Sequence, residues 1–201
     1  MAGAVAVALT KMRDELVEEQ LRTRGLELVG PCEQLSLRSE LLELSPLLRD
    51  FTPAEADLLG ASMLLLRAQP GQLLIEEGEA SDWMMLLLRG TVDVGKRKIG
   101  AAADQQEPGA NTRLAVLKEG AVLGEMSMLD GEPRYASCWA LSEVEAAVLS
   151  RAAVGRLIST DPAVGAKLLV KLTQLLAQRL RNTSSQLVKV LQQQRAAERR
   201  P

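Results

Sequence analysis

The segment "GEMSMLDGEPRYAS", from Gly124 to Ser137, brings a carboxylate, Glu125, close to a guanidinium, Arg134, among small and polar residues. The planar fork of an arginine can hold two oxygens of a phosphate at once, which a lysine cannot do. Gly124 allows a ligand to approach the backbone, and "EMSML" can form one helical turn whose free N–H groups face an anion. These residue types predict a phosphate-binding segment.

Glu125 cannot bind the same phosphate, because the two negative charges repel each other, but its oxygens can accept hydrogen bonds from neighbouring sugar hydroxyls. A carboxylate for a sugar beside an arginine for a phosphate describes a nucleotide site. The segment also has a purely structural interpretation, in which "DGEP" is a hairpin turn and Glu125 pairs with Arg134 in an ordinary salt bridge. The segment by itself leaves both interpretations open.

Composition argues against several classes of protein. The chain has 201 residues with 24 Lys and Arg against 26 Asp and Glu, so no overall positive field attracts nucleic acid. It has no histidine, which removes Ser-His-Asp and Cys-His catalytic units and the commonest general base. Its two cysteines, Cys32 and Cys138, lie far apart and predict reduced thiols rather than a disulfide framework or a metal site. We expect a non-enzymatic protein with no metal or cofactor.

The N-terminal sequence "MAGAVAVAL" is apolar but short, lacks a basic leading region and runs into a charged segment. It fits neither a signal peptide nor a membrane span, so we expect a cytoplasmic protein. An amphipathic helix is predicted from about Val5 to Arg24, ending at Gly25. The helix can pack against the rest of the chain or a twin subunit; its mixed charges make a membrane-surface role the weaker alternative.

Two further helical segments precede a change of pattern. The first is "LSLRSELLELSPLL", and the second begins at "TPAEADLLGASM", where Thr52 can cap the helix, Pro53 fits its first position and Glu55 completes a capping box. From Gly71 onward the sequence changes to short apolar runs separated by glycine, which is typical of an antiparallel barrel or jelly roll. The runs are "QLLIEEG", "WMMLLLRG", "TVDVG", "TRLAVLKEG", "ASCWALS" and "EAAVLS". The small, polar segment between Gly95 and Asn111 is expected to form an exposed, disordered hairpin loop.

A long helix is predicted after the barrel, with Asp161 as its N-cap and Pro162 as its first residue, continuing to about Ala197. Its apolar positions step by threes and fours, which is near the coiled-coil period and predicts a parallel homodimer. Alternatively, the helix covers the barrel of its own chain without a partner. The seam positions are Leu172, Leu176, Leu180, Thr183, Leu187 and Val190.

The order and spacing of these segments resemble the cyclic nucleotide-binding domain family, and within it the sensor half of the bacterial catabolite activators. The resemblance covers roughly Leu41 to Val188. It implies that Gly124, Glu125 and Met126 open a cassette whose backbone N–H groups meet a cyclic phosphate, with the Glu125 side chain on the ribose 2′-hydroxyl. It also implies that Arg134 binds the phosphate.

The same resemblance extends to the long helix, where "RLRNTSSQL" places Thr183 and Ser184 at positions that contact adenine, one of them from a partner subunit. Arg179 falls where an arginine can reach the cassette glutamate, Glu125. Tyr135 departs from the family, which usually has Ser, Thr or Ala beside the phosphate. A bulky ring there affects affinity or nucleotide choice.

These observations predict a mainly β fold: an antiparallel barrel or jelly roll with N-terminal helices and a long C-terminal dimerisation helix. The expected domains are a helical extension at 1–40, the nucleotide-binding barrel at 41–160 and the long helix with a polar tail at 161–201. The expected function is a second-messenger sensor that binds cAMP in preference to cGMP and signals through its last helix to an unidentified effector protein. The alternative is a ligand-free dimeric scaffold. Only 16 residues follow Ser185, too few for a DNA-reading winged helix-turn-helix, so no direct DNA binding and no membrane association are expected.

Overall fold

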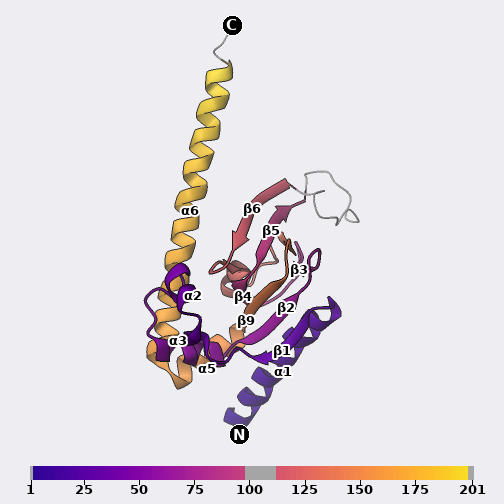
Figure 1. Cartoon of the computed structure of the whole chain (residues 1–201), viewed down its shortest axis with the longest axis vertical. Coiled ribbons are helices and arrows are strands. Elements are labelled where there is room, and N and C mark those ends of the chain that lie inside the picture. Colours follow the sequence, from indigo (N-terminus) through magenta and orange to yellow (C-terminus); the bar gives the residue numbers. More distant parts are fainter. Residues whose placement is uncertain (1, 98–111, 199–201) are drawn as a thin grey trace.

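The computed structural model describes residues 2–97 and 112–198. Two antiparallel sheets form a barrel-like jelly roll, with helices packed at one end and on its flanks (Figure 1). The strand order is β1-β2-β9-β4-β7 in one sheet and β3-β8-β5-β6 in the other. The strands are β1 (Glu27–Pro31), β2 (Leu64–Ala68), β3 (Leu73–Ile75), β4 (Trp83–Arg89), β5 (Thr91–Lys96), β6 (Thr112–Lys118), β7 (Val122–Leu123), β8 (Ser137–Ala140) and β9 (Val144–Ser150). The mainly β fold with flanking helices that the sequence predicted is confirmed.

The run "WMMLLLRG" is strand β4, as its short length predicted. Its residues from Trp83 to Leu88 are all buried, because the strand pairs with β7 and β9 on its two edges and is covered on both faces. A continuous apolar run is the pattern of a strand without a solvent-facing side. The predicted hairpin joins β5 to β6, which pair antiparallel; Gly95 already belongs to β5, and residues 98–111 lie outside the described residues.

The barrel begins earlier than Gly71, where the sequence pattern had placed its start. Strand β2 pairs with β9, and β1 adds to its other edge, so two strands come from the segment predicted to be helices and connections. The short sequence "ELVGP" of β1 carries a glycine and ends in Pro31, which fits only an edge strand. Its hydrogen bonds go to Leu64–Arg67, a segment distant in sequence, so local periodicity could not reveal it.

Helices cover one end of the barrel. Helix α3 (Pro53–Ala61) begins with the predicted capping box between Thr52 and Glu55. The segment predicted as one preceding helix is broken into a 3-10 turn, η1 (Leu35–Leu37), and a short helix, α2 (Ser39–Leu44). Helix α5 (Arg151–Thr160) was not predicted; it follows β9 directly and ends at Thr160. Asp161, predicted as the N-cap of α6, is the C-cap of α5 and the residue directly before α6.

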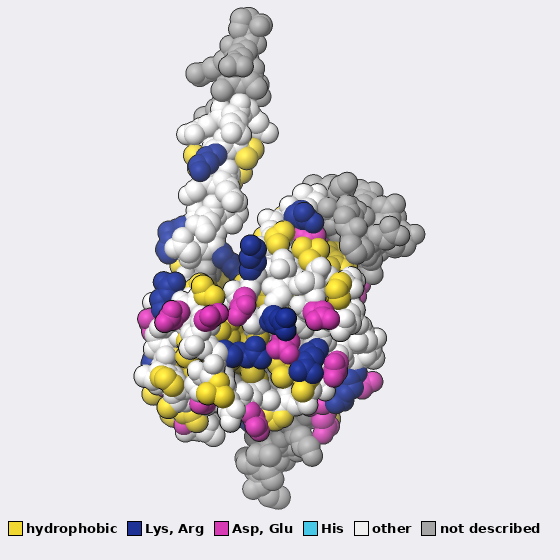
Figure 2. Space-filling view, in the orientation of Figure 1, with side chains coloured by type: hydrophobic (Ala, Val, Ile, Leu, Met, Phe, Trp, Pro, Cys, Tyr) yellow, Lys and Arg dark blue, Asp and Glu magenta, His cyan; other side chains and the backbone are white. Residues whose placement is uncertain are grey.

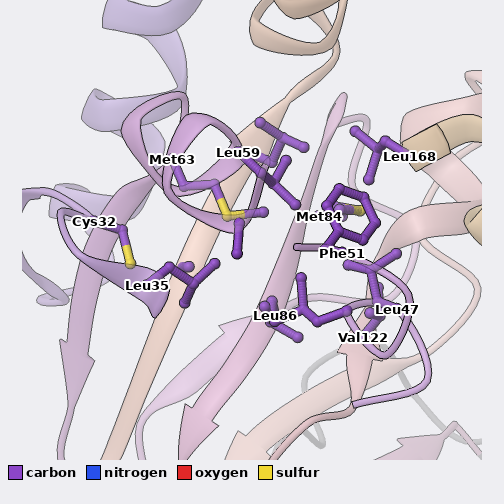
Figure 3. Close-up of a cluster of buried hydrophobic side chains, with 14 of the residues drawn as sticks. Cys32, Leu35, Leu47, Phe51, Leu59, Met63, Met84, Leu86, Val122 and Leu168 are labelled. Atoms are coloured by element: carbon purple, nitrogen blue, oxygen red, sulfur yellow. The ribbon is translucent and has the colours of Figure 1, made fainter. Parts of the chain in front are cut away.

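The apolar residues form two clusters. One lies between the end helices and the sheet and includes Leu35, Leu47, Phe51, Leu59, Met63, Met84, Leu86 and Leu168 (Figure 3). The other fills the barrel and includes Trp83, Leu74, Ile75 and Cys138 together with Val17 and Leu21 of α1 (Ala2–Thr23). Helix α1 therefore belongs to the barrel core. Both cysteines are buried and unpaired, and burial raises the pKa of the Cys138 thiol to about 12, which makes it unreactive.

Helix α6 (Pro162–Glu198) starts at the predicted residue and stands beside the barrel, extending far past it (Figure 1). Leu168 and Leu172 are buried against the end helices, so the seam position Leu172 packs on its own chain rather than on a partner. The distal half stands clear of the barrel (Figure 2) and carries exposed apolar side chains. These are Leu180, Leu187, Val188, Val190 and Leu191. Pairing with a second chain along this half remains a prediction.

Candidate functional site

The segment that opened the sequence analysis forms a tight turn and a short helix, α4 (Glu125–Asp130). The N-cap residue of α4, Gly124, has φ 77°, a left-handed conformation that favours glycine. A Cβ atom at this position would lie 2.5 Å from Nη1 of Arg134. The glycine is required because the arginine folds directly over it. With six residues α4 has little dipole of its own, so Arg134 is the main positive group of the site.

The guanidinium of Arg134 is buried and held by backbone carbonyls. Nη1 donates to Gly124 O at 2.5 Å and Nη2 donates to Trp83 O at 2.5 Å, while the group stacks over the Trp83 ring at 4.3 Å from its centre. Within the described residues it has no ion-pair partner, and its Nε–H has no hydrogen-bond partner. The interpretation in which Glu125 and Arg134 form a salt bridge is therefore wrong.

Burial lowers the pKa of Arg134 to about 10, because removing the cation from water disfavours its charged form. The group remains protonated at neutral pH. Carbonyl oxygens orient it without cancelling its charge, so a desolvated cation with spare donors faces the site. An anion bound there would gain both the charge and the donors.

Glu125 pairs with a different arginine. Its side chain is 1 % exposed and accepts a hydrogen bond from Nη1 of Arg179 on α6, whose Nη2 also donates to Val122 O. This is the contact that the family resemblance implied for Arg179. The long helix is thereby attached to the first residue of α4.

A third arginine holds the other end of α4. Arg151, the first residue of α5, donates from Nε to Met128 O at 2.6 Å and from Nη2 to Ser127 O at 3.0 Å. Ser127 O also accepts from the C-cap N–H of Gly131 at 3.0 Å. A cation satisfies carbonyls at a helix C-terminus well. No local pattern in the sequence predicted this contact, because Arg151 lies more than 20 residues from the carbonyls that it binds and meets them only through the fold.

Glu125, Arg134 and Arg179 line one pocket, with a volume of about 340 Å³. Glu125, Arg134, Arg179 and Thr183 supply its polar groups, and Leu117 and other apolar residues from the strands form its walls. The other apolar lining residues include Ile75, Val94, Leu114, Leu123 and Cys138. A pocket with apolar walls and a few converging polar groups is the usual form of a small-molecule site.

The structure brings nearly all of the predicted site residues together. Gly124, Glu125, Met126, Arg134, Tyr135, Arg179 and Thr183 all line the pocket. Ser184 does not line it from the same chain, because it lies next to Thr183 on a helix and faces away. Asn182 and Gln186 line the pocket and were missed. Helical spacing from Arg179 would have found them, since positions three, four and seven residues later share a face.

Tyr135 stands at the edge of this pocket. Its side chain is 60 % exposed, and Nζ of Lys96 lies 3.6 Å from the ring centre while donating to Tyr135 O at 2.8 Å. The ring is therefore held by a cation–π contact on the surface rather than packed against Arg134.

The residues that the structure describes contain no group of three acidic, cysteine or histidine side chains suited to a metal ion. No helix in the described part of the chain is long and apolar enough to cross a membrane.

Comparison with known proteins agrees with this geometry. The profile of the family described as "Cyclic nucleotide-binding domain" matches residues 65–161. A crystal structure of a cyclic nucleotide-binding domain from Methylobacillus flagellatus KT is 32 % identical, with a TM-score of 0.69 over 82 % of this chain and 88 % of that one. The protein belongs to the cyclic nucleotide-binding domain family.

Two curated relatives are regulatory proteins. The CRP-like cAMP-activated global transcriptional regulator of Mycobacterium tuberculosis is 30 % identical over 121 residues, covering 60 % of this chain and 49 % of that protein. The cAMP-dependent protein kinase regulatory subunit of Yarrowia lipolytica is 27 % identical over 140 residues, covering 70 % of this chain and 34 % of that protein. The chain thus spans about a third to a half of the length of these relatives.

The requirement for glycine at position 124 can be tested with one pair of substitutions. Gly124→Ala is expected to lower the free energy of unfolding by about 1–3 kcal/mol, because the new Cβ is strained by the positive φ and meets Arg134. Gly155→Ala, in the exposed interior of α5 with no atom near its Cβ, is expected to raise it by about 0.5–1 kcal/mol. Urea unfolding measures both; equal effects of the two substitutions would contradict the assignment.

Proposed function

We propose that this protein is a non-enzymatic second-messenger sensor, which binds a cyclic nucleotide in the pocket beside α4 and signals through α6 to a partner protein. One observation carries the proposal: Arg134 is buried, protonated and free of any carboxylate partner among the described residues, in a pocket that also holds a buried glutamate. A cyclic phosphate would pair with the Arg134 guanidinium and accept hydrogen bonds from it, and a ribose hydroxyl would donate to Glu125.

The attachment of α6 to Glu125 supplies the signalling route. A ribose hydroxyl at Glu125 would share or displace the hydrogen bond from Arg179, so nucleotide occupancy would act on the contact that fixes α6 against the cassette. A ligand shifts a conformational equilibrium only by its differential affinity for the two states. The shared carboxylate is a place where such a difference can arise.

The base would lie between the apolar strand residues and α6, where Thr183 and Asn182 offer polar atoms. We propose cAMP ahead of cGMP, supported by the two relatives whose names carry cAMP. Ser184 would reach the base only from a second chain. The proposed domains are the N-terminal extension at 1–40, whose β1 adds an edge strand to the barrel, the barrel at 41–160 and the long helix at 161–201.

The proposed location is the cytoplasm, in keeping with two buried, unpaired thiols. The proposed effector is a protein that contacts α6, because the nucleotide acts on that helix. The regulatory relatives support a regulatory rather than a catalytic role. No direct DNA or membrane binding by the described part of the chain is part of this proposal.

A second function has an observation in its favour. Glu125 is already satisfied by Arg179, and Tyr135 stands where the family resemblance implies a small residue, so the fold could serve as a ligand-free dimeric scaffold. In that case nucleotide binding would be absent from the natural protein.

Replacing Arg134 tests the phosphate site directly. Arg134→Ala is expected to lose about 2–5 kcal/mol of cAMP binding, because truncation leaves the phosphate buried without its cation. Arg49→Ala, an exposed arginine far from the pocket, is the matched control and should bind as the parent does. Isothermal titration of ligand-stripped protein with cAMP, and separately with cGMP, measures both. Parent-like binding by Arg134→Ala would show that the nucleotide binds elsewhere.

Tyr135→Ser separates the sensor from the scaffold. If the protein is a sensor, the exposed ring does not block the phosphate, and the variant should bind cAMP within about threefold of the parent. If the ring abolished binding, the parent would give no heat of binding and the variant would gain it. A heat of binding in Tyr135→Ser but not in the parent, measured by the same isothermal titration, would favour the scaffold.

The proposed homodimer depends on the exposed apolar side chains of distal α6. Leu187→Glu places a charge in that stripe and is expected to shift the protein from dimer to monomer, because a buried unpaired charge is costly. Gln194→Glu, on the polar tail of the same helix, adds the same charge and should leave the dimer intact. Light scattering after size-exclusion chromatography reports the mass; a monomeric parent would refute the dimer.

A further inference from the structure

The last turn of α1 is fixed by its C-cap. Gly25, with φ 73°, donates to Arg22 O, and Leu26 donates to Leu21 O, which is the hydrogen-bond pattern of a Schellman motif. Leu21 is fully buried in the barrel core. The turn therefore sets the position of the intervening Arg24 side chain against the barrel.

Arg24 forms an ion pair with Glu79 on the connection between β3 and β4. Its Nη2 lies 2.6 Å from Oε2 of Glu79 and 3.7 Å from Oε2 of Glu76, and only 12 % of its side chain is exposed. Ion pairs this far from solvent are screened much less than surface pairs.

The segment that contains Glu79 is hydrogen-bonded through its backbone to Arg134, the arginine proposed to bind the phosphate. Arg134 N donates to Glu79 O at 2.9 Å, and Gly78 N donates to Arg134 O at 2.8 Å. After the effect of burial, the Glu79 carboxylate has the largest influence on the pKa of Arg134, which it raises, whereas Arg24 lowers that pKa. Arg24, Glu79 and Arg134 thus form a row of alternating charges.

A second contact leads from α1 to Arg134. The Trp83 indole Nε1 donates to Oε1 of Gln20 at 3.3 Å, and Trp83 carries the Arg134 guanidinium on its ring and on its carbonyl oxygen. Val17 belongs to the same apolar cluster as Ile75 and other pocket-lining residues. Helix α1 therefore contacts Trp83, the residue on which the Arg134 guanidinium stacks.

We propose that Gln20 and Arg24 of the N-terminal segment are positioning residues for Arg134. Gln20 holds Trp83 beneath the guanidinium, and Arg24 neutralises Glu79, so that the charge of Arg134 stays available to the phosphate of the cyclic nucleotide. This inference rests on the proposed function for its ligand. It makes the docked α1 a determinant of nucleotide affinity, and a partner that removed α1 would lower that affinity.

The ligand-free protein supplies the first test. The NMR signal of the Arg134 Nε–H group, identified by its loss in Arg134→Lys, reports the surroundings of the guanidinium without any nucleotide. Arg24→Gln is expected to shift this signal, because Glu79 loses its partner and turns toward Arg134. Arg22→Gln is the matched control: it is the same change two residues earlier, at an exposed residue whose guanidinium pairs with Glu18. An Arg134 signal that stays unmoved in Arg24→Gln would overturn the proposal.

Titration with cAMP supplies the second test. Arg24→Gln is expected to weaken binding roughly tenfold, while Arg22→Gln binds as the parent does. Adding Glu79→Gln to Arg24→Gln should restore affinity, because it removes the carboxylate that competes with the phosphate. If Arg24 merely fastens α1, the double variant will stay weak, and the charge argument will be refuted.

The two tests also separate this inference from the proposed function. If the parent binds neither cAMP nor cGMP, the sensor function is refuted, yet the Arg134 signal still decides whether Arg24 positions the guanidinium. If the parent binds and Arg24→Gln binds equally well with an unmoved signal, only the inference is refuted.

Discussion

The structure depends on one buried cation, Arg134, that has no carboxylate ion-pair partner among residues 2–97 and 112–198. Arg134 is removed from water, held by two carbonyl oxygens and stacked on Trp83, all of which fix its direction and leave its charge in place. Burying a charge is costly unless it is paired. The fold tolerates the cost by surrounding the guanidinium with oriented backbone, and it leaves a site whose free energy would fall when an anion enters.

Around that cation, α4 is held by three arginine side chains, two of which come from distant parts of the chain. Arg134 folds over its first turn, Arg151 from α5 satisfies its last carbonyls, and Arg179 from α6 reaches Glu125. A helix of six residues would not be stable alone. The position of α4 therefore depends on the positions of α5 and α6. This dependence makes α4 suited to transmit a change at the pocket to the long helix.

The N-terminal helix α1 adds further contacts, both to the residues that support Arg134 and to α5. Besides supporting Trp83 and Glu79 near its end, α1 is tied to α5 by Asp14, which pairs with Arg156 and accepts a hydrogen bond from Ser150. The same helix thus contacts the residues that support Arg134 and also α5, which leads into α6. The barrel, α1 and α5 form one connected set of contacts behind the pocket.

The sequence by itself determined the elements whose signals are local. The capped start of α3, the start of α6 at Pro162 and the apolar strand β4 follow from residue types and short spacings. In the cassette, Gly124 is marked by its backbone freedom and Arg134 by its guanidinium. The pairing of Glu125 with Arg179 rather than with the nearer Arg134 was implied by the family resemblance and by no local pattern. Tertiary structure alone decided the edge strand β1. It also decided the approach of Arg24 to Glu79. These contacts join segments far apart in sequence, so they depend on how the sheets close and on which charges burial brings together, and no local period records either.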